Sequence, residues 1–244
     1  MGSKCEKNEN LSGNSMDLYQ AILDFSHQHI DDLKQSYTWE INLEHLPVDL
    51  SLSGNNVYEQ NISLRHQLHH AFSVATDFEE KYKIIRWYIY HWGGVKANSD
   101  STLTEYSQSS PETLILKGAD GIASWSKALS VIDPIRYAIY DARVAMSLNA
   151  LQVIYAVDLP QYFPPLKGRN TLINFFQAKL QTTFLQWNKA NTQTFYQEYL
   201  ALLQQVADQF AENVTRHEVE MLLFAHAEEL SFQAAAKLTH FKTI

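Results

Sequence analysis

Cysteine, glycine and proline are scarce in this sequence, which has 1 cysteine, 8 glycines and 6 prolines among 244 residues. The single cysteine, Cys5, cannot form a disulfide bond within the chain. A large β-sandwich or barrel normally needs more glycine and proline for its turns. No uninterrupted apolar run approaches the roughly 18 residues that a membrane-spanning helix needs. These absences exclude a disulfide-rich scaffold and a spanning helix, and they favour a helical globular protein.

Targeting signals are also missing from the N-terminal residues. No basic cluster is followed there by an apolar run and a cleavage site. The opening Met1-Gly2-Ser3-Lys4-Cys5-Glu6 is close to a myristoylation start, but Glu6 stands where that motif has Ser or Thr. We therefore expect a cytoplasmic protein with no membrane partner. Residues 1–15 have the polar composition of a disordered leader, and residues 16–244 are expected to form a single domain.

The formal net charge of −8 is distributed unevenly along the chain. Lys and Arg number 3 against 10 Asp and Glu in residues 1–60, 13 against 10 in residues 61–190, and 3 against 7 in residues 191–244. The middle of the chain is therefore mildly basic between two acidic flanks. This balance is compatible with a nucleic-acid partner, although it lacks the overall charge of a strongly basic binder.

Apolar residues recur at helical spacing along most of the chain, which predicts an all-α protein of eight to ten helices. The segment from Tyr37 to Gly54 is expected to be a loop or a short extended piece, and Asn98–Ser110 a surface loop. One helix is expected to start near Asp17, two to lie between Gln60 and His91, and a short one to follow Ser110-Pro111 as far as Leu116. Three more are expected at Thr171–Trp187, Asn191–Ala211 and Arg216–Lys237.

The most specific local signals lie between residues 111 and 155. Two glycines three positions apart, Gly118 and Gly121, predict a tight turn between a short helix and a second helix. In that second helix a stripe of apolar residues is expected to be buried, which places Lys127 on the opposite, polar side. Asp141 precedes another apolar stripe of helical period and is an N-cap by position.

These residues resemble the helix-hairpin-helix DNA glycosylases, specifically bacterial proteins with the 8-oxoguanine DNA glycosylase fold. The likeness covers roughly residues 60–235 and is sharpest at about 118–151. It is carried by Gly118-Ala119-Asp120-Gly121, Lys127 and Tyr140-Asp141-Ala142-Arg143-Val144, with further local similarity at Trp92-Gly93-Gly94, Ala123-Ser124-Trp125-Ser126-Lys127 and Gly168-Arg169-Asn170. The resemblance implies a glycosylase-like domain with a hairpin-containing core, a DNA partner and no cofactor.

The resemblance also implies base excision, in which a modified base leaves the DNA stack and Lys127 and Asp141 act on its glycosidic bond. A carboxylate stabilises the positive charge that develops on the sugar, and an amine can attack C1′ to form a Schiff base and open the way to strand cleavage. A lysine with its ordinary pKa of about 10.4 is protonated and inert, so this role requires a lowered pKa. Oxidised guanine follows only from the family's name, and a modified phage base, which would make the protein a phage-defence factor, is an equal alternative.

The same resemblance assigns phosphate binding to the hairpin. The backbone N–H groups around Gly118 and Gly121 and the start of the following helix would hold a phosphate, with Lys117 and Arg143 as neighbouring cations. Arg143 could equally pair with Asp141 or with a helix neighbour. The pocket for the base is expected to draw side chains from the C-terminal helices, among which Phe175, Phe176, Phe224 and His226 are candidates.

Each assignment has a plainer alternative. Lys127 could be an ordinary solvated lysine, and Asp141 could serve only as a helix cap. His66, His69 and His70 share a helical face but have no further ligand in sequence, so no metal site is expected. The net charge favours a rival function, that of a non-catalytic helical protein that binds DNA or another protein.

Overall fold

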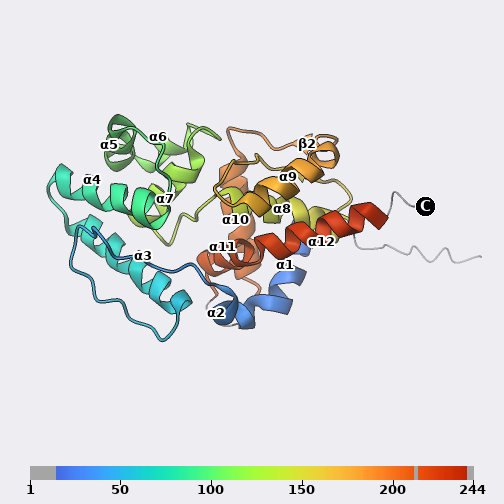
Figure 1. The fold of residues 1–244 in the computed structure, drawn as a ribbon, viewed down its shortest axis with the longest axis horizontal. Coiled ribbons are helices and arrows are strands. Elements are labelled where there is room, and N and C mark those ends of the chain that lie inside the picture. The colour runs from blue at the N-terminus through green and yellow to red at the C-terminus, as the bar shows by residue number, and fades with distance from the viewer. Residues whose placement is uncertain (1–14, 212–213, 241–244) are drawn as a thin grey trace, which may run out of the picture.

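The computed structural model describes residues 15–211 and 214–240, and it is mostly helical (Figure 1). The leader expected at residues 1–15 lies outside this range except for Ser15. The helices are α1 (Leu18–His29), η1 (Ile30–Asp32), α2 (Leu33–Ser36), α3 (Val57–Val74), α4 (Phe78–Trp87), η2 (Tyr88–Trp92), α5 (Asp100–Gln108), α6 (Pro111–Ile115), α7 (Ile122–Ile132), α8 (Ala142–Ile154), α9 (Thr171–Phe184), α10 (Phe195–Ala207), α11 (Arg216–Ala225) and α12 (Ala227–His240). Two short strands, β1 (Gln161–Tyr162) and β2 (Asn188–Lys189), pair in parallel.

The helices form two groups that lie side by side (Figure 1). The central group consists of α3–α7 with η2, whereas the terminal group consists of α1, α2 and α8–α12. Helices from the two ends of the chain meet in the terminal group, since α1 packs against α8, α10 and α11. None of the helices in the described part of the chain is long and apolar enough to cross a bilayer.

Local signals predicted the start and end of several helices correctly. Asp17 caps α1 through a hydrogen bond from the Gln20 amide, and Ser110 caps α6 with Pro111 at its first position. The hairpin between α6 and α7 has the expected backbone, because Gly118 and Gly121 adopt φ angles of 59° and 68° that favour glycine. These features depend only on neighbouring residues, which is why the sequence reveals them.

The end of α4 widens into the π-helical turn η2. The Gly93 amide donates to the Tyr88 carbonyl at 2.8 Å, which is the i to i−5 pattern of a π-helix. The rings of Tyr88 and Trp92 stack at 4.2 Å within this turn. Gly93 and Gly94 end the helix, as the sequence predicted, and Gly94 has a positive φ of 64°.

Two predicted boundaries are wrong. The surface loop expected over Asn98–Ser110 contains α5, which Ser99 caps and which buries Leu103 and Tyr106 on one side. Its other positions are polar, so the helical period is weak in the sequence. The single helix expected over Arg216–Lys237 is divided into α11 and α12 at His226, where no glycine or proline marks the break.

Candidate active site

A small cavity lies where the two groups of helices meet. Lys127 of α7 and Trp92 of η2 reach it from the central group, and Asp141, which caps α8, reaches it from the terminal group. The cavity measures about 30 Å³, which is the space of about one water molecule. Its lining consists of Tyr37, Trp39, Trp92, Gly93, Lys127, Ile139, Asp141, Glu220 and Phe224.

Lys127 lies on the polar side of α7 but is buried, which contradicts the plainer alternative of a solvated lysine. Its side chain is only 4% exposed, because η2 and α3 cover the side of α7 that the sequence leaves polar. The Nζ atom donates to the Ala123 carbonyl at 2.8 Å. Burial lowers the pKa of Lys127, an effect that Asp141 and Glu220 oppose and that Arg65 reinforces.

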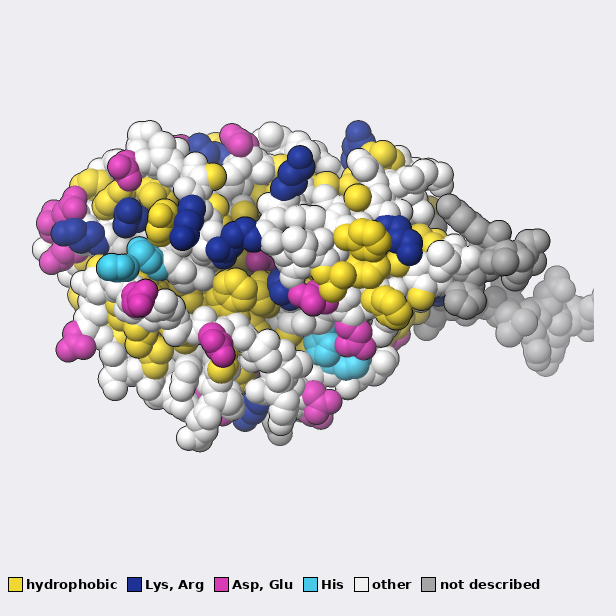
Figure 2. Space-filling view, in the orientation of Figure 1, with side chains coloured by type: hydrophobic (Ala, Val, Ile, Leu, Met, Phe, Trp, Pro, Cys, Tyr) yellow, Lys and Arg dark blue, Asp and Glu magenta, His cyan; other side chains and the backbone are white. Residues whose placement is uncertain are grey.

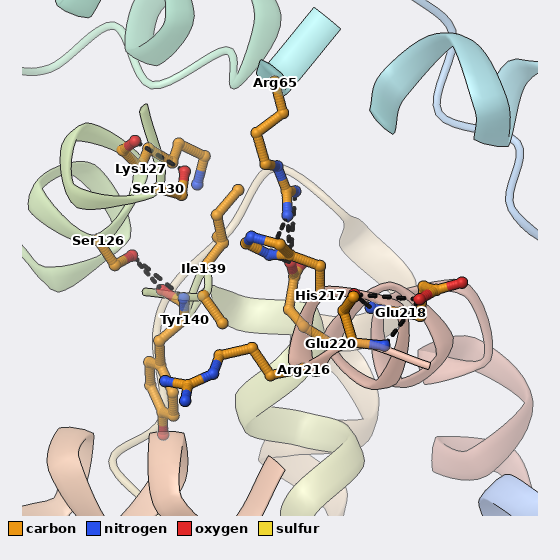
Figure 3. A network of polar contacts seen from close by, with 12 residues as sticks. Arg65, Ser126, Lys127, Ser130, Ile139, Tyr140, Arg216, His217, Glu218 and Glu220 are labelled. Atoms are coloured by element: carbon orange, nitrogen blue, oxygen red, sulfur yellow. Dashed lines mark hydrogen bonds and ion pairs between the residues drawn. The ribbon is translucent and has the colours of Figure 1, made fainter. Parts of the chain in front are cut away.

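The other polar side chains of α7 are buried as well. The Tyr140 amide donates to Ser126 Oγ at 3.1 Å, so the extended segment before α8 is attached to α7 close to Lys127 (Figure 3). Ser130 donates to the Lys127 carbonyl at 2.8 Å. These bonds satisfy the polar face of α7 without solvent and fix the distance between α7 and the start of α8.

Asp141 is the N-cap of α8, as the sequence predicted. Its Oδ1 atom accepts hydrogen bonds from the amides of Arg143 at 3.0 Å and Val144 at 3.1 Å. Among the described residues no hydrogen bond reaches the second carboxylate oxygen, Oδ2. The capping role therefore holds the carboxylate in place while one oxygen is left for another partner in the cavity.

Glu220 is a third ionisable residue of the cavity that the sequence analysis missed. Its Oε2 atom lies 3.3 Å from both terminal nitrogens of Arg65, and the Arg65 guanidinium also contacts His217 (Figure 3). All three side chains are buried. Burial raises the pKa of Glu220, while Arg65 and Lys127 act in the opposite direction. A carboxylate inside the apolar run from Val219 to Phe224 is the signal that could have revealed it.

Three short segments that contribute to the resemblance meet beside this cavity. The turn after η2 contacts two of them, because Gly93 lies against the Lys127 side chain and Gly94 against the Arg169 guanidinium. The segment with Arg169 continues into Asn170, whose amide donates to Glu228 at 2.6 Å. Residues that are far apart in sequence are thereby brought to the same place.

The predicted phosphate-binding residues already have partners. Lys117 forms an ion pair with Glu105 at 2.8 Å, and Arg143 forms one with Glu228 at 2.8 Å, which is neither of the pairings expected for it. A Cβ on Gly118 would collide with the Thr192 carbonyl, so this glycine is required for packing of the hairpin. Gly121 is exposed at the start of α7.

One of the four aromatic candidates from the C-terminal helices is part of the cavity. Phe224 lines it, and the Arg143 guanidinium lies over the Phe224 ring at 5.0 Å. Phe175, Phe176 and His226 do not belong to the lining. Phe175 is 58% exposed on α9, because that helix presents one apolar edge to solvent.

Comparison of the chain with models of protein families, with curated proteins and with solved structures found no match in any of the three. The residues of this cavity and the surface around it are therefore the features that bear on function.

Proposed function

We propose that the protein is a DNA base-excision glycosylase of the helix-hairpin-helix type. The observation that carries this proposal is the meeting of Lys127 and Asp141 at one cavity, with Glu220 as a third ionisable group. An amine of lowered pKa beside a carboxylate is the combination that cleaves an N-glycosidic bond through a covalent intermediate. The resemblance in sequence around both residues supports the same reaction.

In the proposed reaction Asp141 stabilises the charge that develops on the sugar, and Lys127 attacks C1′. The C1′–Nζ bond forms as the bond from C1′ to the base breaks, and the base leaves with the electron pair and one amine proton. Opening of the sugar ring transfers the second amine proton to O4′ and leaves an imine between C1′ and Nζ. Burial supports the neutral amine that this step needs.

Admission of a base requires the cavity to enlarge. A volume of about 30 Å³ cannot hold a nucleobase, and Lys127 must release the Ala123 carbonyl to turn toward the sugar. Trp39 and Phe224, whose rings meet edge to face at 5.4 Å, are the partly exposed aromatic side chains of the lining. In this proposal they move aside and stack on the flipped base.

The hairpin is the proposed contact with the DNA backbone. Gly121 is exposed at the N-terminus of α7. The Ser124 amide donates to the Gly121 carbonyl at 2.8 Å, so the N–H groups of Ile122 and Ala123 are the ones left without a partner in the helix. Lys117 and Arg143 would exchange their pairing with Glu105 and Glu228 for pairing with phosphate.

Borohydride trapping tests the reaction. Reduction during incubation with duplexes that carry a panel of modified bases should link the protein covalently to DNA, because it converts the imine into a stable amine. Lys127→Gln and the apolar Lys127→Met should abolish the trapped product. Lys83→Gln is the matched control, since Lys83 is exposed and pairs with Glu79 on the far part of α4.

Asp141→Asn tests the carboxylate separately. Asn still caps a helix, so the fold should persist while base release slows by about 10² to 10³, the usual effect of losing one electrostatic stabiliser. Asp17→Asn, the same change at the cap of α1, should leave release unchanged. Release that needs Asp141 but gives no trapped product would contradict only the role of Lys127.

The rival function is that of a non-catalytic protein that binds DNA or another protein. The hydrogen bond from Lys127 to Ala123 and the small cavity favour it, because both leave the amine engaged inside the fold. Absence of release from every base in the panel, with Asp141→Asn indistinguishable from the unmodified protein, would contradict the enzyme and favour the rival.

A further inference from the structure

Three basic side chains gather around the turn that follows α4. The guanidinium of Arg86 and the ammonium of Lys96 lie over the same Tyr90 ring, at 5.1 and 5.3 Å from its centre. Arg169 comes from the connector before α9 and lies against Gly94. Figure 2 shows Lys and Arg side chains aligned across this face, from α4 toward the centre of the molecule. Arg86, Lys96 and Arg169 are called the basic row below.

The basic row differs from Lys83, Lys117 and Arg143 because it lacks acidic partners. Among the described residues no ion pair joins Arg86, Lys96 or Arg169 to a carboxylate. Lys83 on the same helix pairs with Glu79, and Lys117 of the hairpin pairs with Glu105. The charge of the basic row is thus available to an anion from outside.

The positive charge of Arg86 and Lys96 affects the pKa of His91, which lies next to Tyr90 in η2. The His91 ring lies 5.1 Å from that of His45. Burial lowers the pKa of His91. The side chains of His45, Arg86 and Lys96 lower it further, and Glu44 is the acidic group that opposes them. The cations therefore outweigh the nearby carboxylate in their effect on this ring.

The basic row adjoins the mouth of the cavity. Trp92 and Gly93 line the cavity, and the next residue, Gly94, is in contact with the Arg169 guanidinium. In Figure 2 a patch of hydrophobic side chains lies directly beneath the aligned cations. A strand held along the basic row would pass beside the opening through which a base would enter.

We propose that the basic row binds the phosphodiester backbone of DNA and presents the strand to the cavity. The inference rests on the proposed function and adds a binding surface outside the hairpin. Three cations without acidic partners, two of them over one aromatic ring, suit a chain of phosphates, since each neutralised phosphate releases counterions. The contribution of the basic row to DNA affinity is independent of base sequence.

Salt-dependent binding of undamaged duplex DNA tests this surface without any catalytic step. The triple variant Arg86→Ser, Lys96→Ser, Arg169→Ser should bind more weakly, and the slope of log affinity against log salt should fall by about 2 to 3, at about 0.9 per lost phosphate contact. The matched control is Lys34→Ser, Lys83→Ser, Arg136→Ser, which removes the same charge from side chains that already pair with carboxylates. Both triple variants are first compared by thermal unfolding.

The inference would be overturned if the basic-row variant had the same salt slope as the unmodified protein. It would also be overturned if the control variant lowered the slope by the same amount as the basic-row variant. A failure of the unmodified protein to bind duplex at low salt would overturn it too. Loss of binding in the variant, with no base released by the unmodified protein, would support the surface and refute the proposed enzyme. Release that continues with an unchanged salt slope would support the enzyme and refute the surface.

Discussion

Gly93 lies so close to Lys127 that no side chain fits between them. A Cβ atom on Gly93 would come within 2.7 Å of Lys127 Cε and 2.8 Å of Cδ. The φ angle of Gly93 is −80°, which any residue can adopt, so the close approach rather than the backbone angle requires glycine here. The turn after η2 therefore determines where the amine lies.

We expect Gly93→Ala to displace Lys127 and to lower the free energy of unfolding by about 1 to 3 kcal/mol, the usual cost of an overpacked interior. The yield of the borohydride-trapped product should fall with it. In a Lys127→Ala background the same change should cost much less, because the colliding atoms are gone. Equal costs in both backgrounds, measured by urea unfolding, would show that Gly93 acts independently of Lys127.

Removal of one partner from the buried Arg65–Glu220 ion pair should be costly. Arg65→Met leaves the Glu220 carboxylate buried without its cation, and we expect a loss of about 3 to 5 kcal/mol in the free energy of unfolding. The double variant Arg65→Met, Glu220→Gln should recover a large part of that loss. A double variant that is less stable than Arg65→Met would contradict this account. Chemical unfolding at neutral pH provides the measurement.

His217 should make stability depend on pH below neutrality. Burial lowers its pKa well below 6.5, and Arg65 lowers it further. The unfolded chain therefore binds a proton near pH 6.5 that the folded chain does not, so stability rises as pH rises toward about 6.5 and this contribution is constant above. His217→Asn should flatten the rise between about pH 5 and 6.5 in urea unfolding. An unchanged slope would mean that His217 is not the group responsible.

The cap of α8 can be separated from the chemistry of Asp141. Asp141→Ala removes the acceptor for the amides of Arg143 and Val144, and it should reduce stability by about 1 kcal/mol. Asp141→Asn should stay within a few tenths of the unmodified protein. Thermal unfolding of both variants gives the comparison, and an equal loss in the two would show that charge, rather than hydrogen bonding, stabilises the helix start.

The hairpin and the Asp141 cap could be predicted because their signals are local. Glycine at positive φ, proline at the first helical position and a capping aspartate act through neighbouring residues. The burial of Lys127 could not be predicted in this way. A helical wheel assigns one apolar side to α7, whereas η2 and α3 cover the other side only in the folded chain.

The ion pair between Arg65 and Glu220 could not be predicted from local sequence either. The two residues are 155 positions apart, and Glu220 lies within an apolar stretch whereas Arg65 stands among polar residues of α3. A charged residue in such a stretch indicates a buried partner, but it does not identify which one. The division of α11 from α12 at His226 was missed for a different reason, since neither glycine nor proline accompanies it.

The π-helical turn η2 makes the length of the chain critical at one place. It accommodates one residue more than an α-helical turn between Tyr88 and Gly93. Deletion of a single residue there would restore α-helical geometry and remove the bulge, while the segment that follows would keep nearly the same direction. The displacement would be confined to the turn, which carries Trp92 of the cavity wall and ends at Gly93 beside Lys127. Loss of one amino acid from this turn would therefore act on the site more than on the packing of the helices around it.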